Sequence, residues 1–140
     1  MTPRLKSLFD EYAAAHRHPT NQLTHKIAIP LIVFHVVAMM DWIPIGDLTG
    51  GIVGIILAGA WYVRHDVRIG VVMSVFMVAC LVLGRFVPTE AVIAIAVVAW
   101  LVQFSGHYVW EKQQPSFFTN ILQALVGPAF FTAKILKIYP

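Results

Sequence analysis

Residues 67–86 read VRIGVVMSVFMVACLVLGRF, and this stretch decides the class of fold. It contains no acidic residue, and its two basic residues, Arg68 and Arg85, stand near its ends. An α-helix needs about 20 consecutive apolar residues to cross a bilayer. The stretch therefore predicts a transmembrane helix. Its Cys80 is the single cysteine of the chain, and we interpret it as a small buried hydrophobic residue.

Apolar segments on both sides of this helix extend the same pattern. Three more candidate spans cover residues 27–40 (or 23–40), 48–63 and 91–109, and the first two of them are short for a bilayer. A fifth apolar stretch, residues 117–139, contains Pro128 and carries Lys134 and Lys137 near its end. We expect it either to span or to form a broken or interfacial helix, because proline interrupts helical hydrogen bonding.

The residues before the first span show a different periodicity. In residues 4–16, large apolar side chains recur at three- and four-residue spacing, which places them on one face of a helix: Leu5, Leu8, Phe9 and Tyr12. The segment is predicted to be a short amphipathic helix. It either lies on the membrane surface and covers a site, or only docks against the bundle.

Composition indicates the same class of protein. Hydrophobic residues make up 59% of the 140 residues and charged residues 12%, and the mean hydropathy is +0.75. A soluble domain of this size has too little interior to hide so much apolar surface. We therefore predict an all-α integral membrane bundle of four to five transmembrane helices with a short N-terminal amphipathic helix, forming a single membrane-embedded domain over residues 1–140. The ten Lys and Arg residues are scattered, so membrane lipid rather than nucleic acid is the expected partner.

The basic residues predict the orientation of the bundle. If the first four spans all cross, one side carries Arg85 and the other carries seven basic residues: Arg4, Lys6, Arg17, Lys26, Arg64, Arg68 and Lys112. The positive-inside rule makes the richer side cytoplasmic. The membrane would be the plasma or inner membrane in a bacterium and the endoplasmic reticulum in a eukaryote. With this parity, His25 and His107 both lie at the cytoplasmic membrane edge.

Two polar clusters interrupt the apolar sequence at this edge, residues 16–25 (HRHPTNQLTH) and residues 103–112 (QFSGHYVWEK). In the second cluster Gln103, His107 and Glu111 follow at four-residue spacing, which puts them in one stripe of a helix. Gly106 leaves room beside His107 for another backbone or a ligand. Imidazoles and carboxylates near lipid are costly unless they have partners, so the clusters indicate a function.

The first cluster can join the second in a metal site. Asn21 and His25 share a helical face, whereas His16 would point away from His25 on a continuous helix. Pro19 favours a break that lets His16 fold back. Several imidazoles and a carboxylate without cysteine are typical of iron, zinc or manganese sites. Spacing alone also allows an interfacial histidine satisfied by lipid headgroups and water. Of the other histidines, His18 is interpreted as solvated, His35 as packed within the bundle, and His65 as a loop residue.

The order of these residues resembles a known family. The pattern His16-x4-Asn21-x3-His25-x4-Pro30, followed by Gln103-Phe104-x-Gly106-His107-x3-Glu111-Lys112-x2-Pro115, is similar to that of the 2-hydroxy fatty acid dioxygenases. These small membrane proteins were long described only as a domain of unknown function, and one eukaryotic member acts in phytosphingosine degradation in the endoplasmic reticulum. The resemblance covers nearly the whole chain, and the QFxGHxxxEK block is its most specific part.

The resemblance implies an Fe(II)-dependent dioxygenase that uses O2 to shorten a long-chain 2-hydroxy fatty acid by one carbon, with loss of CO2. It implies three iron ligands, His16, His25 and His107. It also implies that Glu111 and Asn21 are further ligands or orient the ligands. Family members often carry an acidic residue in the last helix, where this chain has Lys134, so that role is missing or replaced here.

The substrate chemistry fits a site at the membrane edge. A 2-hydroxy acid chelates a metal through its carboxylate and hydroxyl while its chain stays among apolar helices. Candidate substrate-binding residues are Gln103, Arg17 and Lys112; the two cations, like Lys26, would attract the carboxylate, although such residues also serve as interface anchors.

Two other classes of function remain open. A metal-binding membrane protein without catalysis, such as a transporter, would place polar groups at mid-bilayer, where His35 is the one obvious candidate. Another metal-dependent lipid enzyme, such as a zinc hydrolase, is compatible with the same ligands. These patterns leave the oligomeric state and the chain-length preference undetermined.

Overall fold

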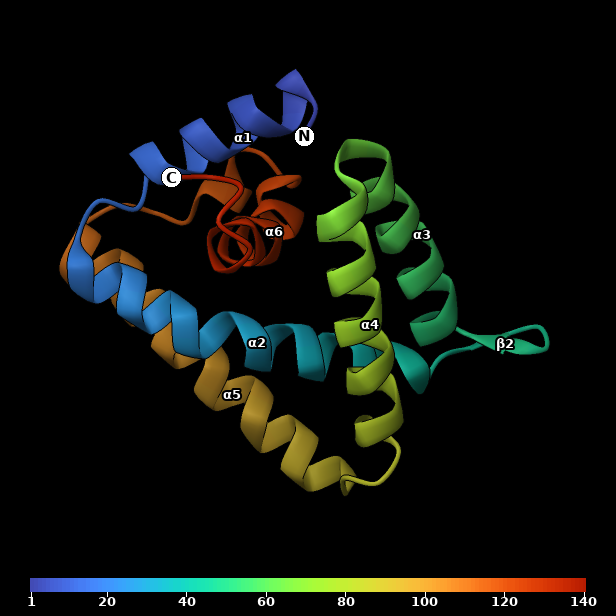
Figure 1. Cartoon of the computed structure of the whole chain (residues 1–140). Helices are drawn as coiled ribbons and strands as arrows, with labels where there is room; N and C mark the ends of the chain where they lie inside the picture. The colour runs from blue at the N-terminus through green and yellow to red at the C-terminus, as the bar shows by residue number, and fades with distance from the viewer.

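The computed structural model describes residues 1–140 and is almost entirely helical (Figure 1). Its helices are α1 (Pro3–Ala14), α2 (Pro19–Asp41), α3 (Gly50–His65), α4 (Val67–Gly84), α5 (Thr89–Ser105), the π-helix η1 (Gly106–Glu111), the 3-10 helix η2 (Ser116–Phe118) and α6 (Gln123–Ile135). A small hairpin joins α2 to α3, in which β1 (Pro44–Ile45) pairs antiparallel with β2 (Leu48–Thr49).

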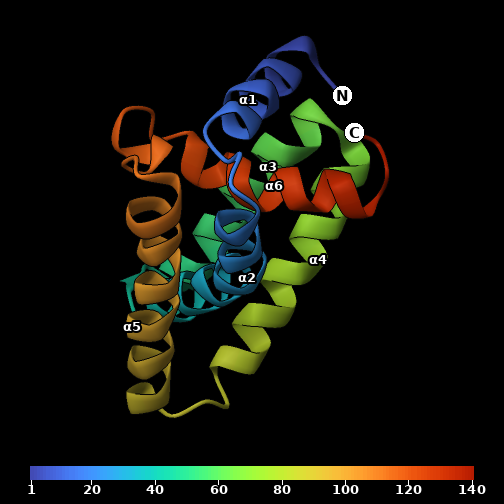
Figure 2. The same ribbon diagram turned by 90° about the vertical axis from the view of Figure 1, so that its left-hand side faces the viewer.

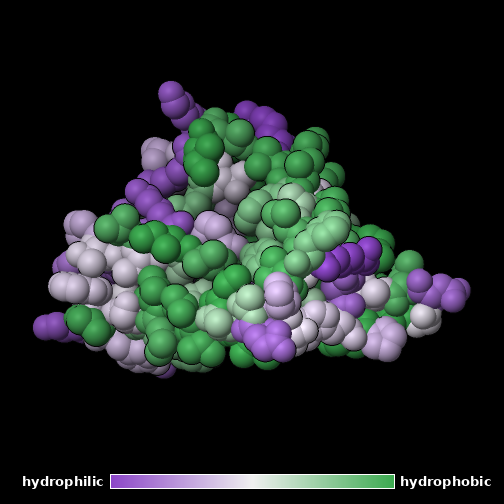
Figure 3. Space-filling model, turned by 90° about the horizontal axis from the view of Figure 1, so that it is seen from below, coloured by the Kyte–Doolittle hydropathy of each residue, from purple (hydrophilic) through white to green (hydrophobic).

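Three helical segments are long and apolar enough to cross a membrane: Pro19–Asp41, Val67–Gly84 and Thr89–Glu111, the last joining α5 to η1. The 16 residues of α3 advance about 24 Å and the 13 residues of α6 about 20 Å, less than the roughly 30 Å of a hydrocarbon core. Large apolar side chains are exposed along the outer faces of α4 and α5. Hydrophobic residues also cover broad areas of the face seen in Figure 3.

The helix boundaries differ from the predicted segments in three places. The first span was expected to start at residue 27 or 23, but α2 already begins at Pro19, where proline suits the first helical turn. The second was expected from Leu48, but Leu48 is in β2, and the Thr49 hydroxyl caps α3 through the Ile52 N–H. The fifth stretch is divided into η2 and α6 between Phe118 and Gln123, whereas α6 continues through Pro128, so the interruption expected at this proline is not observed.

The helices form two packed groups (Figures 1 and 2). In the first group α2 packs against α5 and crosses the α3–α4 hairpin. In the second, α1 lies over α6 at one end of the bundle, and both chain termini are at this end. The buried face of α1 consists of Leu5, Leu8, Phe9 and Tyr12. Phe9 meets Phe130 of α6 edge to face, with ring centroids 5.7 Å apart.

The turn between α3 and α4 holds the N-terminus in place. The Asp66 carboxylate caps α4 by accepting the N–H groups of Arg68 at 3.0 Å and Ile69 at 3.4 Å. It also pairs with the amine of Met1 at 2.9 Å. Burial pushes the pKa of Asp66 upward, but the N-terminal amine, Arg68 and the Ile69 N–H outweigh burial and bring it down to about 2. This one carboxylate thus ties α1 to the α3–α4 hairpin.

Replacing Asp66 with Ala is expected to lower the free energy of unfolding by about 1–2 kcal/mol at neutral pH, because the cap and its partners are lost. A lowered pKa stabilises the fold above the unfolded-state value of 3.8, and this contribution disappears as the pH falls toward about 2. The stability difference between wild type and Asp66→Ala should therefore shrink between about pH 4 and pH 2. Thermal unfolding in detergent, followed by circular dichroism, measures it.

Lys6→Ala is the matched control, because it removes an exposed ion pair to Asp10 on the same end of the bundle. Its effect should stay within about 0.5 kcal/mol. A pH-independent difference for Asp66→Ala would contradict the assignment of the cap to the charged carboxylate.

Candidate metal centre

Three buried histidines from separate parts of the chain converge at one point. His16 lies in the connection between α1 and α2, His25 in the first turns of α2, and His107 in η1. The Nε2 atom of His25 is 3.2 Å from Nε2 of His16 and 2.9 Å from Nε2 of His107. One ligand nitrogen from each ring lies within 4.8 Å of the others. The predicted break at Pro19 thus does bring His16 back to His25.

Backbone carbonyls fix the protonation of two of these rings. Nδ1 of His16 is 2.7 Å from the carbonyl oxygen of Tyr12, and Nδ1 of His25 is 2.7 Å from that of Asn21. A carbonyl only accepts, so each Nδ1 carries the proton and each Nε2 keeps its lone pair. A metal-binding imidazole is usually oriented in this way, by a hydrogen bond from the ring nitrogen that does not bind the metal. Burial lowers the pKa of His16, outweighing the Tyr12 carbonyl and the Glu111 charge, so this ring is neutral.

The donor set fits a divalent transition metal. Nitrogen ligands about 2.1 Å from a common ion and roughly 90–100° apart are themselves about 3.0–3.2 Å from one another. The observed spacings of 2.9 and 3.2 Å agree with that geometry. The Nε2 lone pairs of His16 and His25 face each other and repel, and a cation between them would remove the repulsion. Only histidines belong to the group, and neutral imidazole suits iron, zinc and copper alike.

Glu111 holds the two polar clusters together. Its Oε1 accepts the N–H of Arg17 at 3.1 Å, and its Oε2 accepts the N–H of His18 at 2.9 Å and the amide of Asn21 at 3.0 Å. These partners occupy both carboxylate oxygens and lie directly after His16 and before His25. The structure therefore brings Glu111 and Asn21 together, in a contact that orients the α1–α2 connection.

The helix that carries His107 has a local irregularity. α5 continues as the π-helix η1, which ends at Glu111, and the next residue, Lys112, lies in the left-handed region with φ 56°. Short π-segments within α-helices are frequent at functional sites. A Cβ added to Gly106 would overlap the Thr24 hydroxyl and the Asn21 amide oxygen. The room predicted beside His107 for another backbone or a ligand is taken up by side chains of α2.

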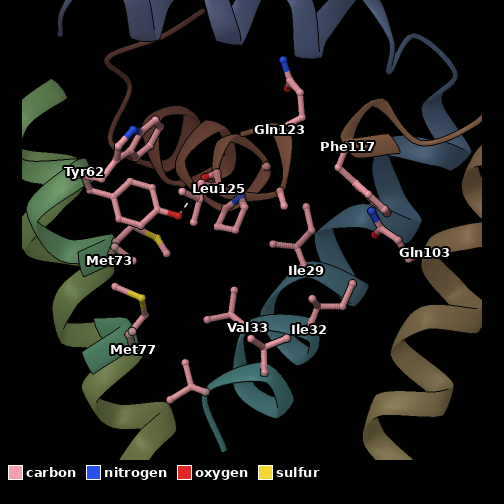
Figure 4. Close-up of a pocket in the computed structure, with 18 of the residues that line it drawn as sticks. Ile29, Ile32, Val33, Tyr62, Met73, Met77, Gln103, Phe117, Gln123 and Leu125 are labelled. Atoms are coloured by element: carbon pink, nitrogen blue, oxygen red, sulfur yellow. Dashed lines mark hydrogen bonds between the residues drawn. The ribbon is translucent and has the colours of Figure 1, made fainter. Parts of the chain in front are cut away.

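A large apolar cavity reaches the histidines. It has a volume of about 540 Å³, and its polar end is lined by His16, His107 and Gln103. The amide nitrogen of Gln103 lies 2.8 Å from Nε2 of His25. Figure 4 shows Ile29, Ile32 and Val33 of α2 pointing into this cavity, opposite Tyr62, Met73 and Met77 of the α3–α4 hairpin.

The remaining predicted residues lie away from this cavity. The side chains of Arg17 and Lys112 are exposed and line neither cavity of the molecule. Lys134 is exposed, with its ammonium 5.3 Å from the centre of the Phe130 ring. It lines a second cavity of about 640 Å³, which is also lined by His25. His18 and His65, predicted to be solvated and in a loop, are outside the cluster, and so is His35, predicted to be packed and the one candidate for a polar group at mid-bilayer.

Two polar residues of the cavity were missed as site residues. The helical periodicity assigns Tyr12 only to the apolar face of the first helix. Gln123 lies within the fifth apolar stretch, and no pattern there assigns it a role. Both line the cavity that reaches the histidines. The spacing of Tyr12, one helical turn before His16, is the sequence signal that could have identified it.

Comparisons with known proteins agree with the resemblance. A family model described as 2-hydroxy-palmitic acid dioxygenase Mpo1-like matches residues 3–138. The chain is 26% identical over 132 residues to the 2-hydroxy-palmitic acid dioxygenase MPO1 of Saccharomyces cerevisiae, and the match covers 91% of this chain and 76% of the yeast protein. No solved structure matches the chain.

Replacing any one of His16, His25 or His107 with Ala is expected to weaken metal affinity by more than the roughly 10- to 100-fold that loss of an orienting residue costs, and so to lower the metal content of the purified protein. Elemental analysis of protein purified in detergent, without added metal, measures the metal content and identifies the ion. His35→Leu is the matched control, because His35 is a buried histidine of α2 outside the cluster. Equal metal in all four variants would contradict the site.

Gly106→Ala is expected to lower the metal content and the free energy of unfolding, the latter by about 1–3 kcal/mol. Alanine favours a helix by about 1 kcal/mol over glycine, so destabilisation would reveal the close contact with α2. Gly54→Ala is the control, because its added Cβ would meet only the flexible end of Met40, 2.8 Å from Cε. If both variants gain stability, η1 does not need glycine at this contact.

Proposed function

The chain belongs to the Mpo1-like family of 2-hydroxy-palmitic acid dioxygenases, and from this premise we propose that it is an Fe(II)-dependent dioxygenase of long-chain 2-hydroxy fatty acids. The enzyme removes the carboxyl carbon as CO2 and leaves a fatty acid one carbon shorter. The observation that carries the proposal is the convergence of three imidazole nitrogens at the polar end of an apolar cavity.

The cavity has the shape that an acyl chain needs. On α2 its lining extends from Ile29 to Met40, which is about 16 Å of helix. An extended chain advances about 1.2 Å per single bond, a third of the roughly 3.6 Å per extended residue, so about 13 bonds fit that length. The head group then lies at the histidines and the tail near Met40, Gly51 and Gly54. No charged side chain lines the cavity.

The cavity supports entry of the substrate from lipid. Among its lining residues, Val36 and Leu57 are exposed, with 38% and 67% of their surface accessible. Both are apolar and belong to α2 and α3, whose outer faces are themselves apolar. A fatty acid dissolved in the bilayer can therefore reach the cavity without exposing its chain to water.

The membrane arrangement belongs to the same proposal. We place the whole chain, residues 1–140, in one membrane-embedded domain in which α2, α3, α4 and α5 cross. The amphipathic α1 and the broken segment with α6 then cover the site at the cytoplasmic edge. The contact of Met1 with Asp66 supports this, because it joins two segments that the parity of four spans puts on one side.

The residues have distinct roles in the proposed reaction. His16, His25 and His107 hold the iron, which when bound supplies coordination of the substrate and activation of O2. Glu111 and Asn21 fix the position of the α1–α2 connection, and hence of His16. Gln103 contacts the substrate head from the cavity wall. The exposed Arg17 and Lys112 attract the carboxylate before it enters.

The overall reaction balances without a further reductant. A 2-hydroxy acid R–CH(OH)–COOH and O2 give R–COOH, CO2 and H2O. The bond between carbons 1 and 2 breaks, carbon 2 is oxidised from an alcohol to a carboxylic acid, and O2 takes up the four electrons. The protein has to bind the head group, keep the chain in register and exclude bulk water from the reacting carbons.

Anaerobic loading with Fe(II), followed by O2 and a 2-hydroxy fatty acid of sixteen carbons, is expected to yield the fifteen-carbon acid and labelled CO2 from a carboxyl-labelled substrate. Mass spectrometry and trapping of CO2 measure the two products. The acid of the same length without the 2-hydroxyl should give neither.

His35→Leu should retain turnover, since His35 is outside both the cluster and the cavity, whereas His25→Ala should lose it. If iron-loaded wild type gives no shortened product, the substrate assignment fails. If zinc-loaded protein instead hydrolyses lipid esters, the chain is a different metal-dependent lipid enzyme.

A further inference from the structure

Several residues that line the apolar cavity carry buried polar atoms without a hydrogen-bond partner. Seven buried side-chain nitrogen and oxygen atoms have no hydrogen-bond partner. Four of them belong to residues that line the cavity: the Tyr12 hydroxyl, Gln103 Oε1, His107 Nδ1 and Gln123 Oε1. A buried polar atom without a partner is costly, and folded proteins leave few. Their gathering in one cavity, beside three converging imidazoles, indicates a ligand with a polar head.

Tyr12 is placed by the same contacts that orient a metal-site histidine. Its ring stacks on that of His16, with centroids 3.9 Å apart and planes at 15°. Its carbonyl accepts the Nδ1 proton of His16. The side chain is 4% exposed, and its hydroxyl has no partner. A tyrosine hydroxyl is protonated at neutral pH, so it can donate a hydrogen bond.

Gln123 presents the complementary group. Its amide nitrogen donates to Oε2 of Glu11 at 3.3 Å, which sets the orientation of the amide because a carboxylate only accepts. In Figure 4 this nitrogen points toward α1. The buried Oε1 on the other side of the amide has no partner, and it is an acceptor.

The Tyr12 hydroxyl lies against α6, the helix that carries Gln123. A Cβ added to Gly127 would be 3.4 Å from the Tyr12 hydroxyl, so that hydroxyl lies against α6 at Gly127. Gln123 is one turn earlier on the same helix, and the two positions are about 6 Å apart along its axis. The two residues therefore meet the same stretch of α6, which lines the cavity.

We propose that Tyr12 and Gln123 bind the head group of a 2-hydroxy acid, Tyr12 by donating to a carboxylate oxygen and Gln123 by accepting the proton of the 2-hydroxyl. A plain carboxylate offers only acceptors, so it would satisfy Tyr12 and leave Gln123 Oε1 unpaired. The pair therefore selects for the 2-hydroxyl, because an unpaired buried acceptor disfavours the analogue that lacks a donor. This inference deepens the proposed function and rests on it for the choice of ligand.

Tyr12→Phe is the first test, because it removes only the hydroxyl and keeps the ring against His16. Since the lost hydroxyl has no partner in the protein, metal content should be unchanged and the melting temperature unchanged or raised. Affinity for a 2-hydroxy fatty acid and for the plain acid should both fall about tenfold or more. Anaerobic displacement of a fluorescent fatty acid from iron-loaded protein measures both affinities without turnover.

Gln123→Met is the second test and separates the two contacts. It should weaken binding of the 2-hydroxy acid and leave that of the plain acid within about twofold, so that the preference for the hydroxyl disappears. In turnover, both variants should raise KM more than they lower kcat. Tyr62→Phe is the matched control for stability, because the Tyr62 hydroxyl is paired with the Leu125 carbonyl at 2.9 Å. Its melting temperature should fall, in contrast to Tyr12→Phe.

The outcomes separate this inference from the proposed function. Weaker binding of the 2-hydroxy acid by both variants supports the inference, even if wild type shows no turnover. Unchanged affinities in both variants overturn it, even if wild type shortens the substrate. A Tyr12→Phe variant that loses stability and metal while keeping its affinity per metal-loaded molecule also overturns it, because Tyr12 would then only support His16.

Discussion

The carboxylate of Glu111 is the contact on which the arrangement of the site depends. It accepts two backbone N–H groups after His16 and the amide of Asn21, one turn before His25. Hydrogen bonds to an ionised acceptor are about twice as strong as neutral ones, and here they join segments at opposite ends of the chain. Glu111 is the last residue of η1, the helix that carries His107. Its hydrogen bonds therefore hold His16 and His25 next to His107.

The irregular backbone around this contact is used for position rather than for stability. The π-helix η1 and the absence of a Cβ at Gly106 let α5 approach α2 closely enough for His107 to meet His25. Glycine and π-helical geometry each lower the stability of a helix. Their place directly beside the histidines agrees with the observation that local rules are broken mainly at functional sites.

Much of the fold and part of the site could be predicted from local patterns. The apolar segments predicted a helical protein, and the structure has helices at each of them, although how many cross a membrane is still a prediction. The meeting of His16, His25 and His107 followed from the break at Pro19 and from counting spans. The boundary at Gly50 was wrong, because a threonine cap acts over one turn and does not change average hydropathy. The interruption expected at Pro128 was also wrong, because α6 continues through this proline.

The sequence by itself determined which segments avoid water, which residues carry chemistry and which family the chain belongs to, because these depend on neighbours along the chain. Only the tertiary structure decided that Glu111 binds the α1–α2 connection, that a cavity of about 540 Å³ ends at the histidines, and that the hydroxyl of Tyr12 and the amide oxygen of Gln123 are unpaired within it. Whether a polar atom has a partner depends on how distant helices pack, and no local spacing contains that information.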